Sequence, residues 1–402
     1  MDRVFVFAHQ PCYGETGGGQ GVVYRLYQAN RKYKLWNNVY FVFGDRVIYN
    51  GEEIGELAEK KEIKKSKVKS KLVKNIPGKF KVIQYEKKYK KLKKYLLEIG
   101  MEYHFTDSDT YIFHDLQFAR AFAEIYAYDK SIMVIHAQGS FYNEWVAIHG
   151  YECKDIKKYY EKCFVQVINK FKFIGFPSEG AKNCFYESAL ELRKYEKECE
   201  YKILYNGVVC PKVKPEHYID FVKKLKESNG YIFATIATLN SAKAVERIPQ
   251  FLGRIKKEGI KFKWVLVGKG VKEENVLAEI INAEIKEETV WLNKYVSHEE
   301  VLQILSIADF YILFHKYSIF DLSTLEAMHY GAIPILTPVG GNLEVIKNEN
   351  GIFIDDFQDI QKFVALIEND LEPIHKLNQK IQQENFNDEA FLKYYVELCT
   401  NI

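Results

Sequence analysis

Short runs of apolar residues recur along the whole chain, separated by longer segments in which apolar positions repeat every three or four residues. The short runs are typical of buried strands, and the longer repeat is typical of amphipathic helices. In the first half, the runs predict strands at residues 4–8, 39–43, 111–114, 131–136, 171–175 and 201–204. In the second half, they predict strands at residues 231–237, 262–267, 289–292, 309–314 and 332–336. Because strands and helices alternate in both halves, we expect an α/β protein with two Rossmann-like, doubly wound domains facing a central cleft.

The pattern breaks at residues 210–215, which contain two prolines and show little periodicity. We therefore expect an N-terminal domain at residues 1–209 and a second domain at residues 216–387. A length of 402 residues suits two domains better than one. A last helix follows the completed second sheet, and we expect this segment, 388–402, to pack back on the first domain.

Cysteine usage and the apolar stretches bear on the cellular setting. The seven cysteines are odd in number and scattered, and no two are separated by only two residues. This indicates reduced thiols, neither a disulfide framework nor a zinc site. The opening MDRVFVFAHQPCYGE predicts a strand, since its apolar run is too short for a signal peptide. No apolar stretch reaches the roughly 18 residues of a membrane-spanning helix, and we expect a cytoplasmic protein.

Positive charge is concentrated in one segment. The net charge is only +3, but residues 60–94 hold 16 lysines and two glutamates, a local balance of +14. Such a segment is often a solvated face, and the alternative is attraction to anionic lipid headgroups. Within it, Tyr85, Tyr89, Leu92 and Leu96 recur at helical spacing, either docking on the core or lying in a lipid interface. Peripheral contact with an anionic membrane through residues 60–97, at the inner face of the plasma membrane, is thus one hypothesis. Nucleic acid is not an expected partner, because no nucleic-acid module is visible.

Candidate chemistry lies in residues 320–346, FDLSTLEAMHYGAIPILTPVGGNLEVI. The segment predicts a loop, a short helix that carries Glu326, and a buried strand. Free N–H groups around Leu322, Ser323 and Thr324 would suit an anion, and Glu326 would accept hydroxyl groups one turn later. A phosphate and a ribose would satisfy both features. The alternative is an ordinary βαβ unit with Glu326 on a solvated face.

Eight motifs follow one another in an order that resembles the GT-B glycosyltransferases, most closely the retaining family-four glycosyltransferases, over nearly the full length. The motifs are TGGGQG (16–21), VIHAQGSF (134–141), GFPSEGAKN followed by ILYNGV (175–208), IATLNSAKAVERIP (236–249), VLVGKG (265–270), WLNKYVSHEEV (291–301), ADFYILF (308–314) and LEAMHYGAIPILTPVGGNLEVI (325–346). The resemblance implies the GT-B fold, with the acceptor bound mainly by the N-terminal domain and a nucleotide-sugar donor by the second domain.

The resemblance also implies roles for individual residues. Lys243 matches the lysine that neutralises the donor diphosphate, and His136 matches a histidine near the transferred sugar. Glu326 matches the second glutamate of a pair and would accept hydrogen bonds from ribose hydroxyls. The remaining matches concern backbone groups: Gly18 and Gly19 in a loop that closes on the donor, Leu322, Ser323, Thr324 and Leu325 at the phosphate, and Tyr295 and Val296 at the base.

Three positions depart from the family pattern. Ser318 stands where the first glutamate of the pair is expected, Asp321 where a glycine is expected, and Thr238 where an arginine accompanies the lysine. Losing the arginine removes a fork of donors to the diphosphate, and losing the glutamate removes an acceptor for sugar hydroxyls. We expect Asp321 to restore a carboxylate from a neighbouring backbone position, which places it with Lys243 and His136 among the catalytic candidates, and Thr238 and Ser318 among the donor-binding ones.

A metal site is not expected. Asp107-Ser108-Asp109 has the Asp-x-Asp form of metal-dependent sugar transferases. However, it precedes its strand, and ligands in open α/β sheets bind at the carboxyl ends of strands. Lys243 and helix dipoles would carry the charge instead, and we expect no cofactor.

The sequence therefore favours a retaining enzyme that moves a sugar from a nucleotide-diphosphate sugar, with UDP as the commonest nucleotide, to a saccharide acceptor. The basic segment suggests a lipid-linked acceptor, as in bacterial-type surface polysaccharide synthesis. Two alternatives stay open. One is a catalytically degenerate subunit that binds an acceptor or a partner enzyme, and the other is an epimerase-type relative on the same scaffold.

Overall fold

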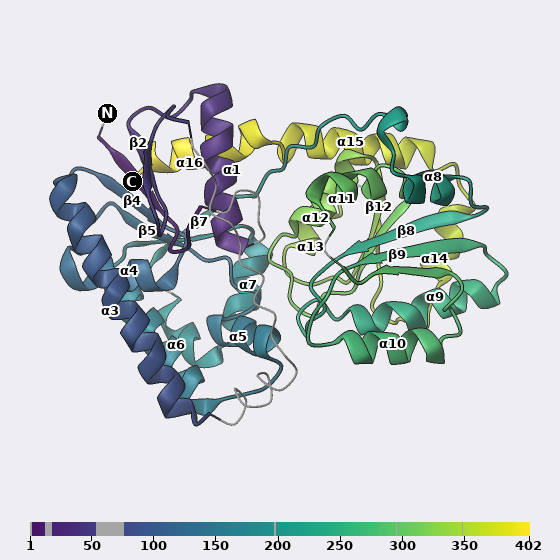
Figure 1. The fold of residues 1–402 in the computed structure, drawn as a ribbon, viewed down its shortest axis with the longest axis horizontal. Coiled ribbons are helices and arrows are strands. Elements are labelled where there is room, and N and C mark those ends of the chain that lie inside the picture. The colour runs from purple at the N-terminus through teal and green to yellow at the C-terminus, as the bar shows by residue number, and fades with distance from the viewer. Residues whose placement is uncertain (1, 13–17, 54–75, 197, 295, 348) are drawn as a thin grey trace.

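A computed structural model describes residues 2–12, 18–53, 76–196, 198–294, 296–347 and 349–402. Within these ranges the chain forms two lobes, each built on a mostly parallel sheet (Figure 1). The prediction of two Rossmann-like α/β domains is confirmed.

The N-terminal sheet has the order β3-β2-β1-β4-β5-β6-β7, and its neighbours run parallel except β2 and β3. Its strands are β1 (Val4–Phe7), β2 (Val39–Val42), β3 (Val47–Tyr49), β4 (Thr110–Phe113), β5 (Ser131–Val134), β6 (Phe173–Phe176) and β7 (Glu200–Ile203). The helices of this lobe are α1 (Gly18–Tyr33), α3 (Gly78–Glu102), α4 (Leu116–Ile125), α5 (Phe141–His149), α6 (Lys154–Ile168) and α7 (Glu179–Glu187), with the short η1 (Leu190–Tyr195).

The C-terminal sheet has the order β10-β9-β8-β11-β12-β13 and is parallel throughout. Its strands are β8 (Tyr231–Ile236), β9 (Phe262–Val267), β10 (Thr289–Leu292), β11 (Phe310–Leu313), β12 (Ile333–Leu336) and β13 (Ile352–Phe353). Its helices are α8 (Asp220–Lys226), α9 (Ile248–Lys257), α10 (Glu273–Asn282), α11 (His298–Leu305), α12 (Leu322–His329), α13 (Asn342–Val345), α14 (Gln361–Ile367) and α15 (Glu372–Asn385), with the short η2 (Pro215–His217) and η3 (Val245–Arg247).

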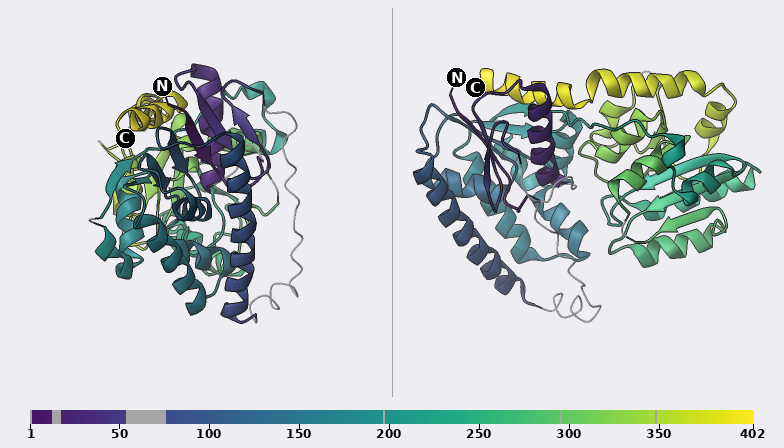
Figure 2. Two further views of the ribbon diagram at one scale, coloured as in Figure 1. Left: turned by 90° about the vertical axis from the view of Figure 1, so that its left-hand side faces the viewer. Right: turned by 45° about the horizontal axis from the view of Figure 1, so that its top comes forward.

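The last helix, α16 (Asp388–Thr400), leaves the C-terminal lobe and lies along the N-terminal one (Figures 1 and 2). Its apolar residues Phe391, Leu392 and Tyr395 share a buried cluster with α1 and one face of the N-terminal sheet. Asp388 anchors its start, accepting a hydrogen bond from Tyr33 on α1 at 2.8 Å. The end of the chain therefore ties the two lobes together.

The opposite face of the N-terminal sheet is covered by α3, α4 and α6. The helical stripe of α3 lies here: Tyr89 and Leu96 are buried, and Tyr85 and Leu92 pack against the same core. The stripe therefore docks on the protein, which decides between the two alternatives left open by its spacing.

One expected loop differs from the structure. Gly18 and Gly19 were expected in a loop, but α1 already begins at Gly18. First-turn residues need helical backbone angles but no intrahelical partner for their N–H groups, so glycines are tolerated there. After β8 and its loop, the chain first forms η3 and becomes α-helical only at Ile248, where Pro249 suits the first turn.

The lobes also meet directly where α7 contacts α13 and the loop before it. The Glu344 carboxylate of the C-terminal lobe accepts hydrogen bonds from the Gly180 amide at 2.8 Å and the Tyr205 hydroxyl at 2.7 Å. Gly180 is required at this contact, since a Cβ atom there would lie 2.1 Å from the carbonyl of Gly340. A carboxylate at the start of α7 is also favoured by the helix dipole. These hydrogen bonds hold the two lobes together next to the segment that carries Asp321.

The Asp-x-Asp segment is built into the fold. The Asp109 carboxylate binds the Arg3 guanidinium through two hydrogen bonds, at 3.0 and 2.7 Å, and accepts another from the Thr106 amide at 3.0 Å. Burial opposes ionisation of Asp109, but these bonds outweigh it and hold the pKa of Asp109 below its ordinary value of 3.8. Asp109 thus joins the start of β1 to the loop before β4.

We predict that Asp109→Asn lowers the free energy of unfolding by about 1–2 kcal/mol at neutral pH, because it removes the charge that Arg3 binds. The folded-state pKa is depressed, so this contribution is complete above pH 3.8 and disappears as the pH falls through the lower folded-state value. Urea denaturation of both proteins between neutral and acidic pH measures the difference. The exposed Asp107→Asn is the matched control, and equal stability of the two variants would contradict the structural role of Asp109.

Candidate functional site

Three charged or titratable side chains meet at the carboxyl ends of β8 and β11. Lys243 follows β8 in a loop shaped by Asn240, whose side-chain oxygen accepts the amides of Ala242 and Lys243, both at 3.0 Å. His315 follows β11, and Asp321 is the residue before the first turn of α12. Parallel strands place these loops at one edge of the sheet, where open α/β folds bind ligands.

The Lys243 ammonium donates a hydrogen bond to Asp321 Oδ1 and lies 3.1 Å from His315 Nε2. His315 Nε2 is 3.8 Å from the same carboxylate oxygen. Lys243 and His315 are buried, and the Asp321 side chain is only 11% exposed. The predicted diphosphate lysine is therefore engaged in an internal ion pair in this structure.

Burial opposes ionisation of Asp321, but Lys243 and His315 outweigh it and hold the pKa of Asp321 well below its usual range. Burial, reinforced by the charge of Lys243, lowers the pKa of His315 to about 4. At neutral pH the cluster thus contains one cation, one anion and a neutral imidazole. Its net charge is zero.

The second oxygen of Asp321 also has protein partners. Asp321 Oδ2 lies 2.6 Å from the Ser323 hydroxyl and 3.3 Å from both the Tyr311 hydroxyl and the Thr324 hydroxyl. A sugar hydroxyl would compete with these donors for Asp321. The expected role of Asp321 as a sugar acceptor stays a prediction.

The backbone on both sides of the ion pair has left-handed geometry. Ala244, directly after Lys243, has φ 45°, and Phe320, directly before Asp321, has φ 125°. Side-chain-bearing residues rarely adopt such angles, and each costs of order 1–3 kcal/mol. Phe320 is held by packing against Tyr205 and Phe386. Strained backbone therefore adjoins both charged residues in the chain.

Glu326 forms a second cluster, on the same helix as Ser323 and Thr324. It is 5% exposed, which excludes the solvated-face alternative. Its Oε1 lies 3.0 Å from His298 Nε2 and 3.8 Å from the guanidinium of Arg25, which belongs to α1 of the other lobe. No hydrogen bond from the described residues reaches Oε2. One oxygen of the predicted ribose carboxylate is thus used and the other is open.

The other predicted residues are more dispersed. Gly18 and Gly19 open α1, the helix that carries Arg25, and Leu322 opens α12 with Leu325 inside it. Thr238 is exposed beyond β8. Ser318 is buried, and its hydroxyl has no partner among the described residues. Tyr295 lies outside the described residues, and Val296 is half-buried beside it.

His136 belongs to the N-terminal lobe, where its Nε2 lies 2.8 Å from His114 Nδ1. Burial lowers the pKa of His136 to about 4, and burial together with His136 holds the pKa of His114 well below its ordinary value. A second pair lies at the same sheet edge, with His9 Nδ1 2.8 Å from the Asp115 carboxylate. Both pairs follow the carboxyl ends of N-terminal strands, where an acceptor is expected.

Sequence reasoning missed His315, His298 and Arg25. His315 carried a signal, since it directly follows a predicted strand of the second domain. Arg25 carried none, because its contact with Glu326 joins residues of different lobes.

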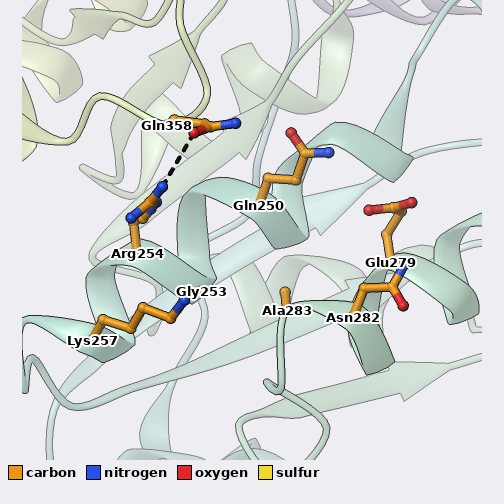
Figure 3. Close-up of a pocket in the computed structure, with 8 residues that line it drawn as sticks. All are labelled: Gln250, Gly253, Arg254, Lys257, Glu279, Asn282, Ala283 and Gln358. Carbon is orange, nitrogen blue, oxygen red and sulfur yellow. Dashed lines mark hydrogen bonds between the residues drawn. The ribbon is translucent and has the colours of Figure 1, made fainter.

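Two pockets lie outside the ion-pair cluster. One, of ≈ 270 Å³, is a polar groove on α9 and α10 bordered by Arg254, Lys257 and Glu279 (Figure 3). The other, of ≈ 430 Å³, lies between the connection at Val209–Lys214 and α11, and includes His298, the partner of Glu326. Only the second pocket adjoins a predicted site residue.

The C-terminal lobe, which holds this site, matches a known protein family. Residues 216–387 match the model of the family "Glycosyl transferases group 1", which spans Lys243, Asp321 and Glu326. The C-terminal lobe thus matches a glycosyltransferase family model, and the chain as a whole shares the two-lobed fold of solved glycosyltransferase structures. The finer resemblance to family four stays a prediction. A search of curated protein sequences found no match.

Solved structures share the fold of this chain. A Staphylococcus aureus TarM mutant in complex with fondaparinux, α-GlcNAc-glycerol and UDP is 16% identical with a TM-score of 0.53; the alignment covers 73% of this chain and 56% of TarM. Anabaena Alr3699/HepE in complex with UDP is 14% identical with a TM-score of 0.63, covering 100% of both chains. The catalytic domain of Arabidopsis thaliana starch synthase IV, bound to ADP and acarbose, is 16% identical with a TM-score of 0.65, covering 100% and 99%. The chain spans little more than half the length of TarM.

We predict that Lys243→Ala lowers the free energy of unfolding by about 3 kcal/mol, because it leaves the Asp321 carboxylate largely buried without a cation. The double variant Lys243→Ala/Asp321→Ala should recover most of this loss. Chemical denaturation without ligand measures both. The control is Lys376→Ala, which breaks an exposed pair with Glu372 at 3.2 Å and should cost less than about 0.5 kcal/mol. A Lys243→Ala loss as small as the control would show that the buried pair does not form.

Proposed function

We propose that the protein transfers a sugar, with retention of anomeric configuration, from a nucleotide-diphosphate sugar to a saccharide acceptor bound mainly by the N-terminal lobe. The observation that carries the proposal is Lys243, a buried ammonium at the carboxyl edge of the C-terminal sheet, beside the first turn of α12. UDP is the proposed nucleotide, a choice supported by the UDP complexes of TarM and Alr3699/HepE.

The donor would bind by exchange of ion-pair partners. In the structure Asp321 neutralises Lys243, and Thr238 contributes no charge in place of the expected arginine. A diphosphate would take over Lys243 and the first-turn amides of α12, and Asp321 would then be free to accept a hydrogen bond from the sugar. This accounts for a carboxylate at a position where the family pattern has glycine.

The transfer breaks the bond between the anomeric carbon and the diphosphate oxygen. The electron pair leaves with the nucleoside diphosphate, and the acceptor oxygen bonds to the same carbon and passes its proton to the leaving diphosphate oxygen. Lys243 and the amides of α12 would stabilise the negative charge that develops on the leaving oxygen. His136, whose low pKa keeps it neutral at pH 7, is the proposed contact to the transferred sugar. The proposed reaction requires no metal or other cofactor.

Glu326 would hold the ribose. Its open Oε2 can accept a hydroxyl hydrogen bond while Oε1 keeps His298. Arg25 brings α1, with Gly18 and Gly19 at its start, next to the same carboxylate. Ribose binding would therefore also stabilise the approach of the two lobes.

The acceptor we propose is a lipid-linked saccharide of the kind used in bacterial-type surface polysaccharide synthesis, met at the inner face of the plasma membrane. The lysine excess of residues 60–94 in the acceptor lobe supports this choice. No helix in the described ranges combines the length and apolar character needed to cross a bilayer, so the proposed contact is peripheral.

A degenerate, non-catalytic subunit is the second candidate function. It is favoured by one observation, that the predicted diphosphate lysine already has an internal counter-ion.

A nucleotide panel distinguishes the two functions. We predict that UDP raises the unfolding temperature, since saturation at 100 times the dissociation constant adds about 2.7 kcal/mol. GDP and ADP should have smaller effects, and Lys243→Ala should strongly reduce the UDP shift relative to its own value without nucleotide. If none of the three nucleotides changes the unfolding temperature, the non-catalytic function is favoured.

Asp321→Ala is predicted to lower the rate of sugar transfer by about 10- to 100-fold, because the sugar loses an acceptor that acts only after donor binding. Single-turnover measurements with saturating donor separate this effect from binding. An unchanged rate would rule out the catalytic role of Asp321.

A further inference from the structure

The helix α3 has two different long faces. Its inward face packs on α4 and α6 through Tyr89, Leu96 and their neighbours. Its other face points away from both lobes: α3 runs along the outer side of the N-terminal lobe in Figure 1 and stands in front in the left view of Figure 2. With 25 residues, the helix offers a straight edge about 37 Å long.

Large apolar side chains are exposed at both ends of this outward face. Phe80 is 60% exposed and Ile83 is 49% exposed near the start, while Leu97 is 38% and Met101 is 68% exposed near the end. At helical spacing these four residues fall on one side of α3. No described element covers them.

Lysines fill the middle of the same face. Lys87, Lys90, Lys91 and Lys94 are all exposed. Lys94 lies 3.5 Å from Glu98, one turn further along. The other three have no described carboxylate within ion-pair distance. The nearby acids are occupied elsewhere, Glu86 by Arg120 at 2.8 Å and Glu124 by Lys93 at 2.8 Å.

We infer that the outward face of α3 (Phe80, Ile83, Lys87, Lys90, Lys91, Lys94, Leu97 and Met101) is the surface by which the acceptor lobe docks on an anionic lipid bilayer. The helix would lie in the plane of the membrane, with the apolar groups below the headgroups and the lysine ammonium groups among them. Charge selects this occupant: a single-sign lysine row suits phosphate headgroups, and the flanking apolar groups would stay in water against a nucleic acid. The inference rests on the proposed membrane contact. It assigns this contact to the outward face of α3, because the opposite face, which carries the helical stripe of Tyr85, Tyr89, Leu92 and Leu96, packs on the core.

Vesicle flotation of the full chain tests the inference. We expect binding to phosphatidylcholine vesicles that contain phosphatidylglycerol, and far weaker binding to pure phosphatidylcholine vesicles. The triple variant Lys87→Gln/Lys90→Gln/Lys91→Gln should bind about a hundredfold more weakly, at on the order of 1 kcal/mol for each lysine. Added salt should weaken the wild type toward the same level.

A matched control removes the same charge elsewhere. Lys223→Gln/Lys224→Gln/Lys226→Gln changes three exposed lysines of α8 in the other lobe and should bind vesicles like the wild type. Phe80→Ser/Met101→Ser tests the apolar part and should also weaken binding, by at least about tenfold.

Equal vesicle binding by the α3 triple variant and the wild type would overturn the inference, as would equal loss in the α8 control. Nucleotide-induced thermal shifts and transfer to a soluble saccharide, measured on the same variants, should stay unchanged. Loss of vesicle binding with retained transfer supports the docking face. If the α3 triple variant loses both vesicle binding and sugar transfer, the loss reflects a folding defect. The variant Phe80→Ser/Met101→Ser, which keeps all the lysines, then decides: weaker vesicle binding with retained transfer supports the docking face, and unchanged vesicle binding overturns it.

Discussion

The ion pair between Lys243 and Asp321 is the constraint on which the rest of the donor site depends. A buried ammonium is unfavourable without a counter-charge, and this chain supplies one from the residue that starts α12. Residues with left-handed backbone, Ala244 and Phe320, directly adjoin the two members of the pair in the chain. The pair also explains the low pKa of Asp321, whereas burial is the main reason that the neighbouring His315 is neutral.

The lobe arrangement places further groups around this centre. Glu344 and Gly180 hold the lobes in contact next to the loop that leads to Asp321, and Arg25 reaches Glu326 from the other side. The terminal helix α16 adds a third link through Asp388. Nucleotide binding between α1 and α12 would therefore act on contacts that already join the lobes, rather than on two separate bodies.

The local pattern of the sequence predicted the fold class and the loops that carry the candidate site. Alternating apolar runs predicted both sheets except the short strands β3 and β13, and Lys243, Ser323 and Thr324 do meet Asp321 at one sheet edge. The pattern could not show that Asp321 points at Lys243, because that contact depends on backbone angles unusual for alanine and phenylalanine. It could not predict the Arg25–Glu326 contact either, since the two residues lie 301 positions apart in different lobes. The helical stripe of α3 was recognised, but its direction depended on tertiary packing.

The most direct test of this account is a double-mutant cycle for UDP binding, measured by titration calorimetry on the wild type, Lys243→Ala, Asp321→Asn and the double variant. If Asp321 and the diphosphate compete for Lys243, Asp321→Asn should tighten UDP binding by about tenfold in the wild-type background, which corresponds to about 1.4 kcal/mol. The same substitution should change little once Lys243 is alanine. An equal gain in both backgrounds, or weaker binding by Asp321→Asn alone, would contradict the exchange of partners at Lys243.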